Sequence, residues 1–317
     1  MPPWSDRRAL ELLHTTLPIV QAPMAGAQGV ELAIAVSRAG GLGSLPCAML
    51  SPAQVAEQVA AFRAASGGPL NLNFVCHQPP AADAAREQAW RERLAPFYRE
   101  LGLDPAAPIP VSNRAPFDAA FCEVVEALRP EVVSFHFGLP APDLLARVKA
   151  SGAVVLSSAT TVDEARWLAQ HGCDAIIAQG SEAGGHRGLF LNDEVWTQPG
   201  LFALLPQVVQ AVDVPVIAAG AIASGRGMAA ALQLGAAAVQ VGTAYLFCPE
   251  ARISAPHRAA LMAAGDHTAL TNVFTGRPAR GILNRAMREL GPMSPLAPAF
   301  PLAGGALAPL RAAAEAQ

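Results

Sequence analysis

The alternation of apolar and helical segments in this sequence predicts an α/β fold, a (β/α)8 TIM barrel with a small additional helical lobe. Short apolar runs alternate with alanine-rich segments of helical period, which is the pattern of repeated βα units around a parallel sheet. Several of the helical segments end in glycine, the residue favoured just after a helix. The expected strands are residues 18–23, 42–46, 70–76, 132–137, 153–157, 175–179, 214–219 and 237–243. An open doubly wound sheet would give a similar alternation and is the alternative fold.

The domain organisation is predicted from the helices between these strands and from two stretches that interrupt the alternation of strands and helices. The expected helices are residues 30–39, 52–65, 142–150, 161–171 and 224–234. Residues 77–117 interrupt the alternation and are expected to hold an extra helix over 84–101. After Cys248 the helical candidates are 255–264 and 280–290, followed by a loop over 291–307 and a short amphipathic tail. We therefore expect a barrel over 1–248, to which 297–317 returns, and a helical lobe over 249–296 near the barrel mouth.

Composition excludes several classes of function. Hydrophobic residues make up 52% of the chain and charged residues 15%, so a large core is expected. The formal charge is −3 and the cationic residues are scattered, which argues against nucleic acid as a partner. Lys149 is the only lysine, so Schiff-base chemistry and a phosphate-loop lysine have almost no candidate.

The cysteines and the N-terminus indicate the compartment. The five cysteines are odd in number, widely spaced and mostly inside apolar runs, which favours reduced thiols over disulfides or zinc sites. The N-terminus lacks the apolar core of a signal peptide, and no stretch approaches the roughly 18 apolar residues of a membrane span. A cytoplasmic protein without a membrane partner is therefore expected.

Unusual residues follow the first and third predicted strands, at the barrel end where function gathers. Ala22, Pro23 and Met24 form a small, proline-stiffened turn that would let a flat aromatic ring lie against the main chain, although an ordinary tight turn is the alternative. Asn71 and Asn73 alternate to one face of the third strand. A barrel-interior asparagine needs hydrogen-bond partners, which a ligand or the core could supply.

The sixth predicted strand, which ends at Gln179, runs into a glycine-rich loop over 180–188. Four glycines in this loop allow backbone N–H groups to approach a ligand closely, as in an anion nest. His186 in the same loop is a natural general base because imidazole titrates near neutrality. Glu182 and His186 are four residues apart, but the glycines between them disfavour the helix of a zinc motif, so no metal is expected.

Glycine turns also follow the last two predicted strands. Gly220 and Ala221 follow the seventh strand, and residues 240–243 end the eighth. Such a pair of turns forms the usual phosphate site of a barrel, where N–H dipoles hold a phosphate without a lysine. A single phosphate suits FMN better than a dinucleotide, and no Gly-x-Gly-x-x-Gly follows the first strand. Taken alone, these turns indicate only a phosphorylated ligand.

Six ordered segments of the chain resemble those of class I nitronate monooxygenases, formerly called 2-nitropropane dioxygenases. The matching segments are residues 18–24, 40–44, 73–77, 134–138, 182–188 and 276–281, and the resemblance covers nearly the whole chain. It implies an FMN-dependent barrel that oxidises alkyl nitronates, such as propionate 3-nitronate, with O2 to carbonyl compounds and nitrite.

The resemblance also implies roles for individual residues. His186 matches the catalytic base of the family, and His136 matches a second pocket histidine that would bind the nitro group. The strand ends and the resemblance together predict an FMN site formed by Ala22, Pro23, Met24, Asn73, Gln179, Gly184, Gly185, Gly220, Ala221, Gln240, Val241, Gly242 and Thr243.

The chain departs from the family pattern in two places. The family commonly has two glycines after the seventh strand where this chain has Gly220 and Ala221, which would alter the phosphate contacts slightly if that position has positive φ. Relatives usually continue into a Trp-containing tail beyond the position of Gln317.

Two other functions stay open at this stage. An FMN-dependent NAD(P)H:quinone or enoyl-thioester reductase would share the glycine and histidine loop, although residues 134–138 favour the oxygenase. A non-catalytic flavin- or phosphate-binding module is the second alternative. The substrates expected for the oxygenase are a small nitronate or nitroalkane and O2, and a homodimer is one option for the assembly.

Overall fold

The computed structural model describes residues 4, 6–110 and 112–315, and these residues form two compact units. The first unit comprises the described parts of residues 1–77, 115–183 and 188–253. The second comprises the described parts of 78–114, 184–187 and 254–317. Within the described ranges, no helix has the length and apolar character that crossing a membrane requires.

The first unit is built on eight parallel strands, and all eight were predicted from the sequence. Their order around the sheet is β1-β9-β8-β6-β5-β4-β3-β2. The sheet closes between β1 and β2, because Leu42 N donates to Ile19 O at 2.9 Å and Gln21 N donates to Leu42 O at 3.0 Å. This closure confirms the barrel and excludes the open doubly wound sheet. The strands are β1 (Ile19–Gln21), β2 (Gly43–Pro46), β3 (Leu70–Val75), β4 (Val132–His136), β5 (Val154–Ala159), β6 (Ala175–Gln179), β8 (Val216–Ala219) and β9 (Ala238–Val241).

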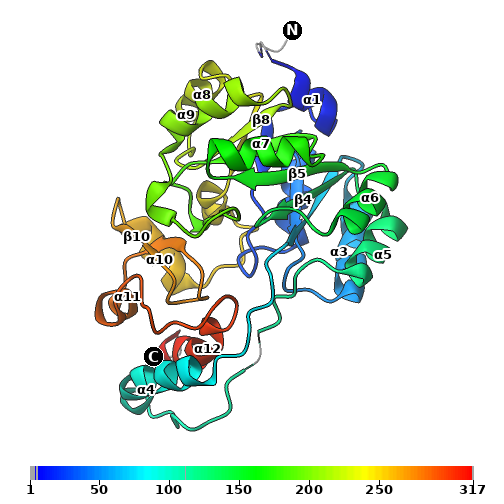
Figure 1. Ribbon diagram of the computed structural model, residues 1–317. Coiled ribbons are helices and arrows are strands. Elements are labelled where there is room, and N and C mark those ends of the chain that lie inside the picture. Colours follow the sequence, from blue (N-terminus) through cyan, green and yellow to red (C-terminus); the bar gives the residue numbers. More distant parts are fainter. Residues whose placement is uncertain (1–3, 5, 111, 316–317) are drawn as a thin grey trace. The chain divides into compact units, whose positions relative to one another are not determined.

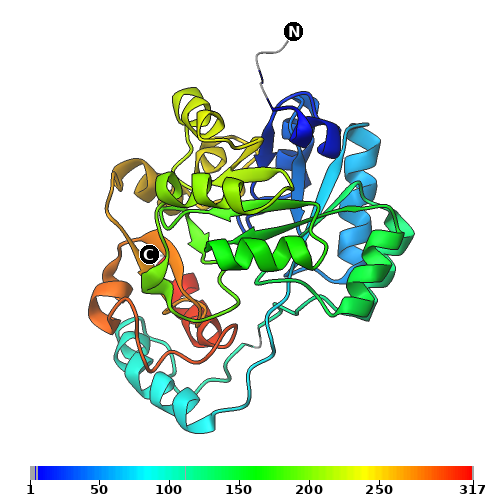
Figure 2. The same cartoon turned by 45° about the horizontal axis from the view of Figure 1, so that its top comes forward.

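Helices cover the outside of the barrel strands. Figures 1 and 2 show α3, α5 and α6 side by side on the outer face, and α7 packs against α8. Ser51, Thr161 and Ser224 cap the N-termini of α3, α7 and α9 with their side-chain oxygens. The helices are α1 (Arg8–Leu13), α2 (Val30–Arg38), α3 (Pro52–Ala65), α5 (Ala119–Leu128), α6 (Pro142–Ala150), α7 (Val162–Gln170), α8 (Leu201–Ala211) and α9 (Gly225–Gln233), with 3-10 turns η1 (Val195–Thr197) and η2 (Thr243–Phe247).

Two apolar clusters bury the barrel strands on both faces, as a parallel barrel requires. One lies between strands and helices and includes Phe62, Phe74 and Phe135. The other includes Val20 and Ile217 of the strands together with Ala9 and Leu13 of α1. Helix α1 thus contributes Ala9 and Leu13 to the same cluster as residues of the barrel strands.

The second unit is a small lobe of helices and a three-stranded antiparallel sheet. Helix α12 packs on α4, where the indole Nε1 of Trp90 donates to Ala303 O at 3.2 Å and the Tyr98 hydroxyl donates to Ala306 O at 2.6 Å. Figure 1 shows this helix pair in red and cyan. The elements are β7 (Gly185–His186), α4 (Ala84–Glu100), α10 (Ala255–Ala263), β10 (Thr268–Thr271), β11 (Ala279–Ile282), α11 (Arg285–Leu290) and α12 (Ala303–Glu315).

Two predictions for the C-terminal part are corrected. The helix predicted over 280–290 is wrong in its first half, because residues 279–282 pair as β11 with β10 and β7, and the helix begins only at Arg285, after the Asn284 cap. Gly281 weakens a helix there, and long-range pairing decides the outcome. The predicted loop over 291–307 is also too long, since α12 begins at Ala303.

The boundaries of the two units differ from the predicted division. Residues 297–317 were assigned to the barrel, whereas their described part lies in the second unit because α12 buries its apolar residues against α4. Residues 249–253 lie in the first unit, and the interrupting segment 78–114 belongs to the second.

The five cysteines are free thiols, as predicted. Cys47, Cys122 and Cys173 are buried, while Cys76 and Cys248 are half-buried. Burial raises the pKa of the Cys47 thiol to about 12, so this thiol stays protonated and unreactive at neutral pH.

Candidate active site

Four neighbouring strands of the barrel bring most of the predicted cofactor residues to one edge. The register pairs Gln21 with Val241, Gln240 with Ala219, and Ala219 in turn with Gln179. Parallel strands in this register end at the same level, so the turns that follow β1, β8 and β9 are neighbours. The backbone confirms this for two of them, since Ala22 N donates to Val241 O at 2.8 Å.

The turn over residues 22–24 is held by a buried side-chain network. Gln28 Oε1 accepts from Met24 N at 2.9 Å and from Gln21 Nε2 at 2.7 Å. Its Nε2 donates to Ser44 O at 2.8 Å, and Gln21 Oε1 accepts from Ser44 N at 3.1 Å. Gln28 was not predicted from the sequence. It fixes the backbone of the turn against which a flat ring would lie.

The glycine turns after β8 and β9 lie close against neighbouring parts of the chain. Gly220 has φ +116°, and a Cβ there would lie 3.1 Å from Ala183 N, so the position requires glycine. A Cβ on Gly242 would lie 3.3 Å from Ala22 Cβ. Ser224, the cap of α9, follows closely, so a helix N-terminus with its positive dipole end adjoins the first turn.

Ala221 has φ +55°, which is the left-handed conformation. This is the condition under which an alanine in place of the family's second glycine was expected to alter the phosphate contacts. A left-handed alanine costs about 1–2 kcal/mol, and the greater unfolded-state freedom of glycine costs about 0.5–1 kcal/mol. We therefore expect Ala221→Gly to raise the free energy of unfolding by up to about 1.5 kcal/mol, measured by urea titration. Ala223→Gly, in the same exposed loop without positive φ, should lower it, and equal effects of the two variants would contradict the strain.

Three polar side chains at the strand ends differ in how well they are satisfied. Gln179 Oε1 accepts from Gly188 N at 2.8 Å, and Asn73 Nδ2 donates to Ser134 Oγ at 2.9 Å and to Ser134 O at 3.2 Å. Gln240 Oε1 is buried and has no hydrogen-bond partner among the residues that the structure describes. A buried acceptor without a partner is costly, so this atom points to a ligand that supplies an N–H or O–H.

His136, at the end of β4, lies in a compact cluster of the first unit. Its Nδ1 is 2.8 Å from Ser158 Oγ on β5. A Cβ on Gly188 would lie 2.9 Å from His136 Cε1 and 3.0 Å from Ser158 Cβ, so only glycine fits beside the ring. Ser158 was not predicted, because nothing in its local sequence separates it from Ser157.

Two carboxylates near the glycine loop have structural partners. Glu164 is 1% exposed and accepts from Thr160 N at 2.6 Å, Thr160 Oγ1 at 2.7 Å and Phe190 N at 2.7 Å, which ties the segment after Gly188 to the start of α7. Glu182 accepts from Leu201 N at 2.9 Å and so caps α8. Within residues 4, 6–110 and 112–315, no group of three or more His, Cys, Asp or Glu side chains is arranged to hold a metal.

The second unit holds Gly184, Gly185 and His186. Gly185 has φ +77°, and Gly185 and His186 form strand β7, antiparallel to β11, with His186 paired to Ala279. The imidazole Nε2 lies 2.8 Å from Thr275 Oγ1, and the ring meets Phe300 edge-on with centroids 5.4 Å apart. Thr275 was not predicted. The segment 276–281 singled out in the sequence thus supplies the strand that pairs with the histidine.

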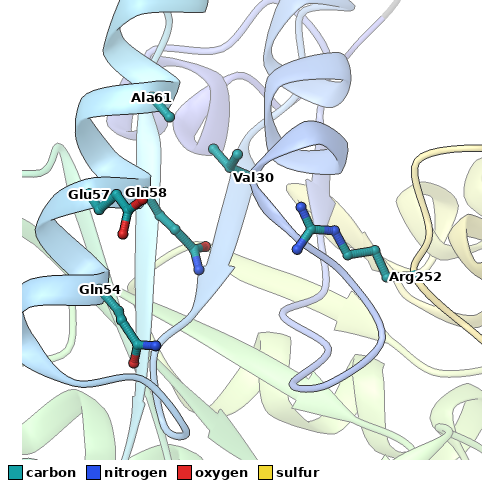
Figure 3. A pocket seen from close by; sticks show the side chains of 6 residues that line it. All are labelled: Val30, Gln54, Glu57, Gln58, Ala61 and Arg252. Carbon is teal, nitrogen blue, oxygen red and sulfur yellow. The ribbon is translucent and has the colours of Figure 1, made fainter.

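A pocket on the outer side of the first unit contains none of the predicted residues. It lies between the start of α2 and residues 54–61 of α3, and the Arg252 side chain lines it as well (Figure 3). The Arg252 guanidinium is paired with Glu31 at 2.6 Å. Its lining residues are Val30, Gln54, Glu57, Gln58, Ala61 and Arg252.

Comparisons with known proteins agree on one family. The model of the nitronate monooxygenase family matches residues 7–317. The chain is 42% identical over 315 residues to a nitronate monooxygenase of Paraburkholderia phytofirmans, covering 98% of this chain and 86% of that protein. It is 41% identical to one of Pseudomonas aeruginosa, covering 98% and 89%. A crystal structure of a nitroalkane oxidase from Streptomyces ansochromogenes matches with a TM-score of 0.88 at 39% identity, covering 98% of this chain and 88% of that one. The chain therefore belongs to the nitronate monooxygenase family of oxidoreductases.

Proposed function

We propose that this enzyme oxidises alkyl nitronates, such as propionate 3-nitronate, with O2 to a carbonyl compound and nitrite, and that FMN is its cofactor. The observation that carries the proposal is the convergence of three turns and the unsatisfied Gln240 Oε1 at the carboxyl ends of adjacent strands. Full-length similarity to nitronate monooxygenases and to a nitroalkane oxidase supports the same reaction.

The residues at the strand ends fit FMN. Gly220, Ala221, Gly242 and Thr243 would hold its phosphate, because they form two close turns beside a helix N-terminus. The ring would be held by Ala22, Pro23, Met24, Asn73, Gln179, Gln240 and Val241, with Gln240 Oε1 accepting from a ring N–H. Bound there, FMN would supply the electron acceptor that the oxidation of a nitronate requires.

His136 and His186 would act on the substrate in different ways. If Ser158 donates to Nδ1 of His136, the proton of that ring stays on Nε2, where it can bind an anionic nitro oxygen. His186 would accept the α-proton of a neutral nitroalkane and convert it to the nitronate. A substrate supplied as the nitronate needs no proton acceptor.

Ser158→Ala tests the role given to His136. Loss of one hydrogen bond of about 0.5–1.5 kcal/mol should loosen the ring and raise KM for the nitronate about 2- to 10-fold, with little change in kcat. Ser157→Ala is the matched control, because among the residues that the structure describes the Ser157 hydroxyl bonds only the carbonyls of Phe135 and Gly138. A fall in kcat at unchanged KM would contradict substrate binding by His136.

The reaction itself is tested by mixing the purified protein anaerobically with propionate 3-nitronate, and separately with NADH, while flavin absorbance is followed. Bleaching by the nitronate alone, and nitrite release once air is admitted, would support the oxidation. Bleaching by NADH alone would move the assignment to the reductase alternative. A protein that is colourless and cannot be reconstituted with FMN would overturn both. A homodimer stays a prediction, which light scattering would test.

A further inference from the structure

Thr275 stands on a rigid turn of the second unit. Asn272 O accepts from Gly276 N at 2.7 Å, while the Asn272 side chain donates to Ser294 O at 2.9 Å and accepts from Ser294 N at 2.8 Å. Gly276 has φ +92°, and a Cβ there would lie 2.1 Å from Pro298 O, so the turn is packed tightly against residues 298–300. A side chain on this turn has a defined position.

His186 is fixed toward Thr275 by its backbone and by its ring. The pairing of β7 with β11 and the bond from Arg187 N to Pro278 O at 2.9 Å set the path of the main chain. The edge-on contact with Phe300 sets the ring plane. The imidazole therefore meets the hydroxyl through one particular nitrogen, Nε2, at 2.8 Å.

We infer the direction of this hydrogen bond from the second contact of the Thr275 hydroxyl. A threonine hydroxyl has one proton to donate, and Thr275 Oγ1 donates it to Arg277 O at 3.4 Å, a carbonyl that can only accept. The hydroxyl oxygen then accepts from His186 Nε2. In a neutral imidazole the other nitrogen, Nδ1, carries the lone pair.

We propose that Thr275 is a positioning residue that keeps the proton of neutral His186 on Nε2, so that Nδ1 is the atom that accepts the substrate proton. The inference rests on the proposed role of His186 as base. In the step, the α-C–H bond of a neutral nitroalkane breaks, an N–H bond forms at Nδ1, and the electron pair stays on the substrate as the nitronate. The resulting imidazolium still donates from Nε2 to Thr275, so the same contact serves both protonation states.

The tautomer can be read directly. The measurement is an NMR spectrum of holoenzyme labelled with 15N-histidine, taken at a pH where the imidazoles are neutral. The chain has seven histidines, so the His186 signal is assigned as the one that disappears in His186→Asn. We expect that signal to show a protonated Nε2 and an unprotonated Nδ1. Thr275→Ser should keep this pattern, whereas Thr275→Val should give a mixture of tautomers or the opposite one.

Kinetics supply the second readout. Removing the group that holds a catalytic histidine in one tautomer can cost several orders of magnitude, and we expect Thr275→Val to lower kcat on a neutral nitroalkane at least about tenfold. Thr275→Ser should restore it, and turnover of a preformed nitronate should change little. Thr268→Val is the control, since Thr268 lies on the neighbouring strand β10 and its hydroxyl contacts Arg280.

A protonated Nδ1 on His186 in the unsubstituted enzyme overturns the inference, and this result does not depend on how any variant folds. Equal kcat of Thr275→Val and the unsubstituted enzyme on the neutral nitroalkane also overturns it. If the Nε2–H tautomer is found but His186→Asn turns over the nitroalkane normally, Nδ1 is not the proton acceptor and the proposed role of His186 fails, while the hydrogen-bond direction stands.

Discussion

His186→Asn is expected to lower turnover of a neutral nitroalkane at least about 100-fold, within the range that general acid–base catalysis contributes. Asparagine is close to histidine in size and can still donate to Thr275, so the turn and strand β7 should persist. Turnover of the corresponding preformed nitronate should fall less than about threefold, because no proton has to be removed. Oxygen consumption with nitroethane and with ethyl nitronate measures both.

His171→Asn is the control for this result. His171 lies at the end of α7, exposed and stacked on Trp167, and we expect its replacement to leave both activities unchanged. Equal losses on the two substrates in His186→Asn would assign His186 to binding or structure and not to proton transfer.

Glu164→Gln is expected to lower the free energy of unfolding by about 3 kcal/mol, since hydrogen bonds to a charged group contribute about 1.5–3 kcal/mol and a buried donor left unpaired costs about 1–3 kcal/mol. The carboxylate accepts from Thr160 and from Phe190 on its two oxygens. An amide can accept on one side only, so its NH2 group would face a donor on the other. Urea unfolding of the holoenzyme measures the change.

Asp163→Asn provides the comparison, because Asp163 is the preceding residue and its side chain is 82% exposed. Within the described part of the chain it forms an ion pair only with Arg166. This variant should change stability by less than about 0.5 kcal/mol. Similar shifts in the midpoints of the two variants would show that the buried contacts of Glu164 contribute little.

The barrel strands could be predicted because most of them are buried on both faces and therefore form short, largely apolar runs in the sequence. The small antiparallel sheet could not. Its strand β7 has two residues, Gly185 and His186, in a segment whose glycines favour a loop, and its partner β11 lies more than ninety residues later. Pairing over such a distance leaves no local signal.

Some residues of the candidate site could likewise be predicted from the sequence, and others could not. Gly220 was predicted because it lies in a glycine turn directly after a strand and matches a flavin position of the family. For Ala221, an effect on the phosphate contacts was expected only if its φ were positive, and its φ is +55°. Gln28, Glu164 and Thr275 were missed because their importance comes from partners that only the folded chain supplies. Glu164 in particular has the sequence context of an exposed carboxylate in the first turn of an amphipathic helix, yet it is fully buried.

The order of the segments along the chain limits how this enzyme can be recombined. The second unit is assembled from three separate pieces, and one of them, residues 184–187, is an insertion of four residues between barrel segments. A chimera that exchanged only residues 254–317 with those of a relative would pair a foreign β11 with the native His186. Exchange of intact lobes therefore requires all three pieces to move together, and fragments cut at a single junction will separate the histidine from Thr275.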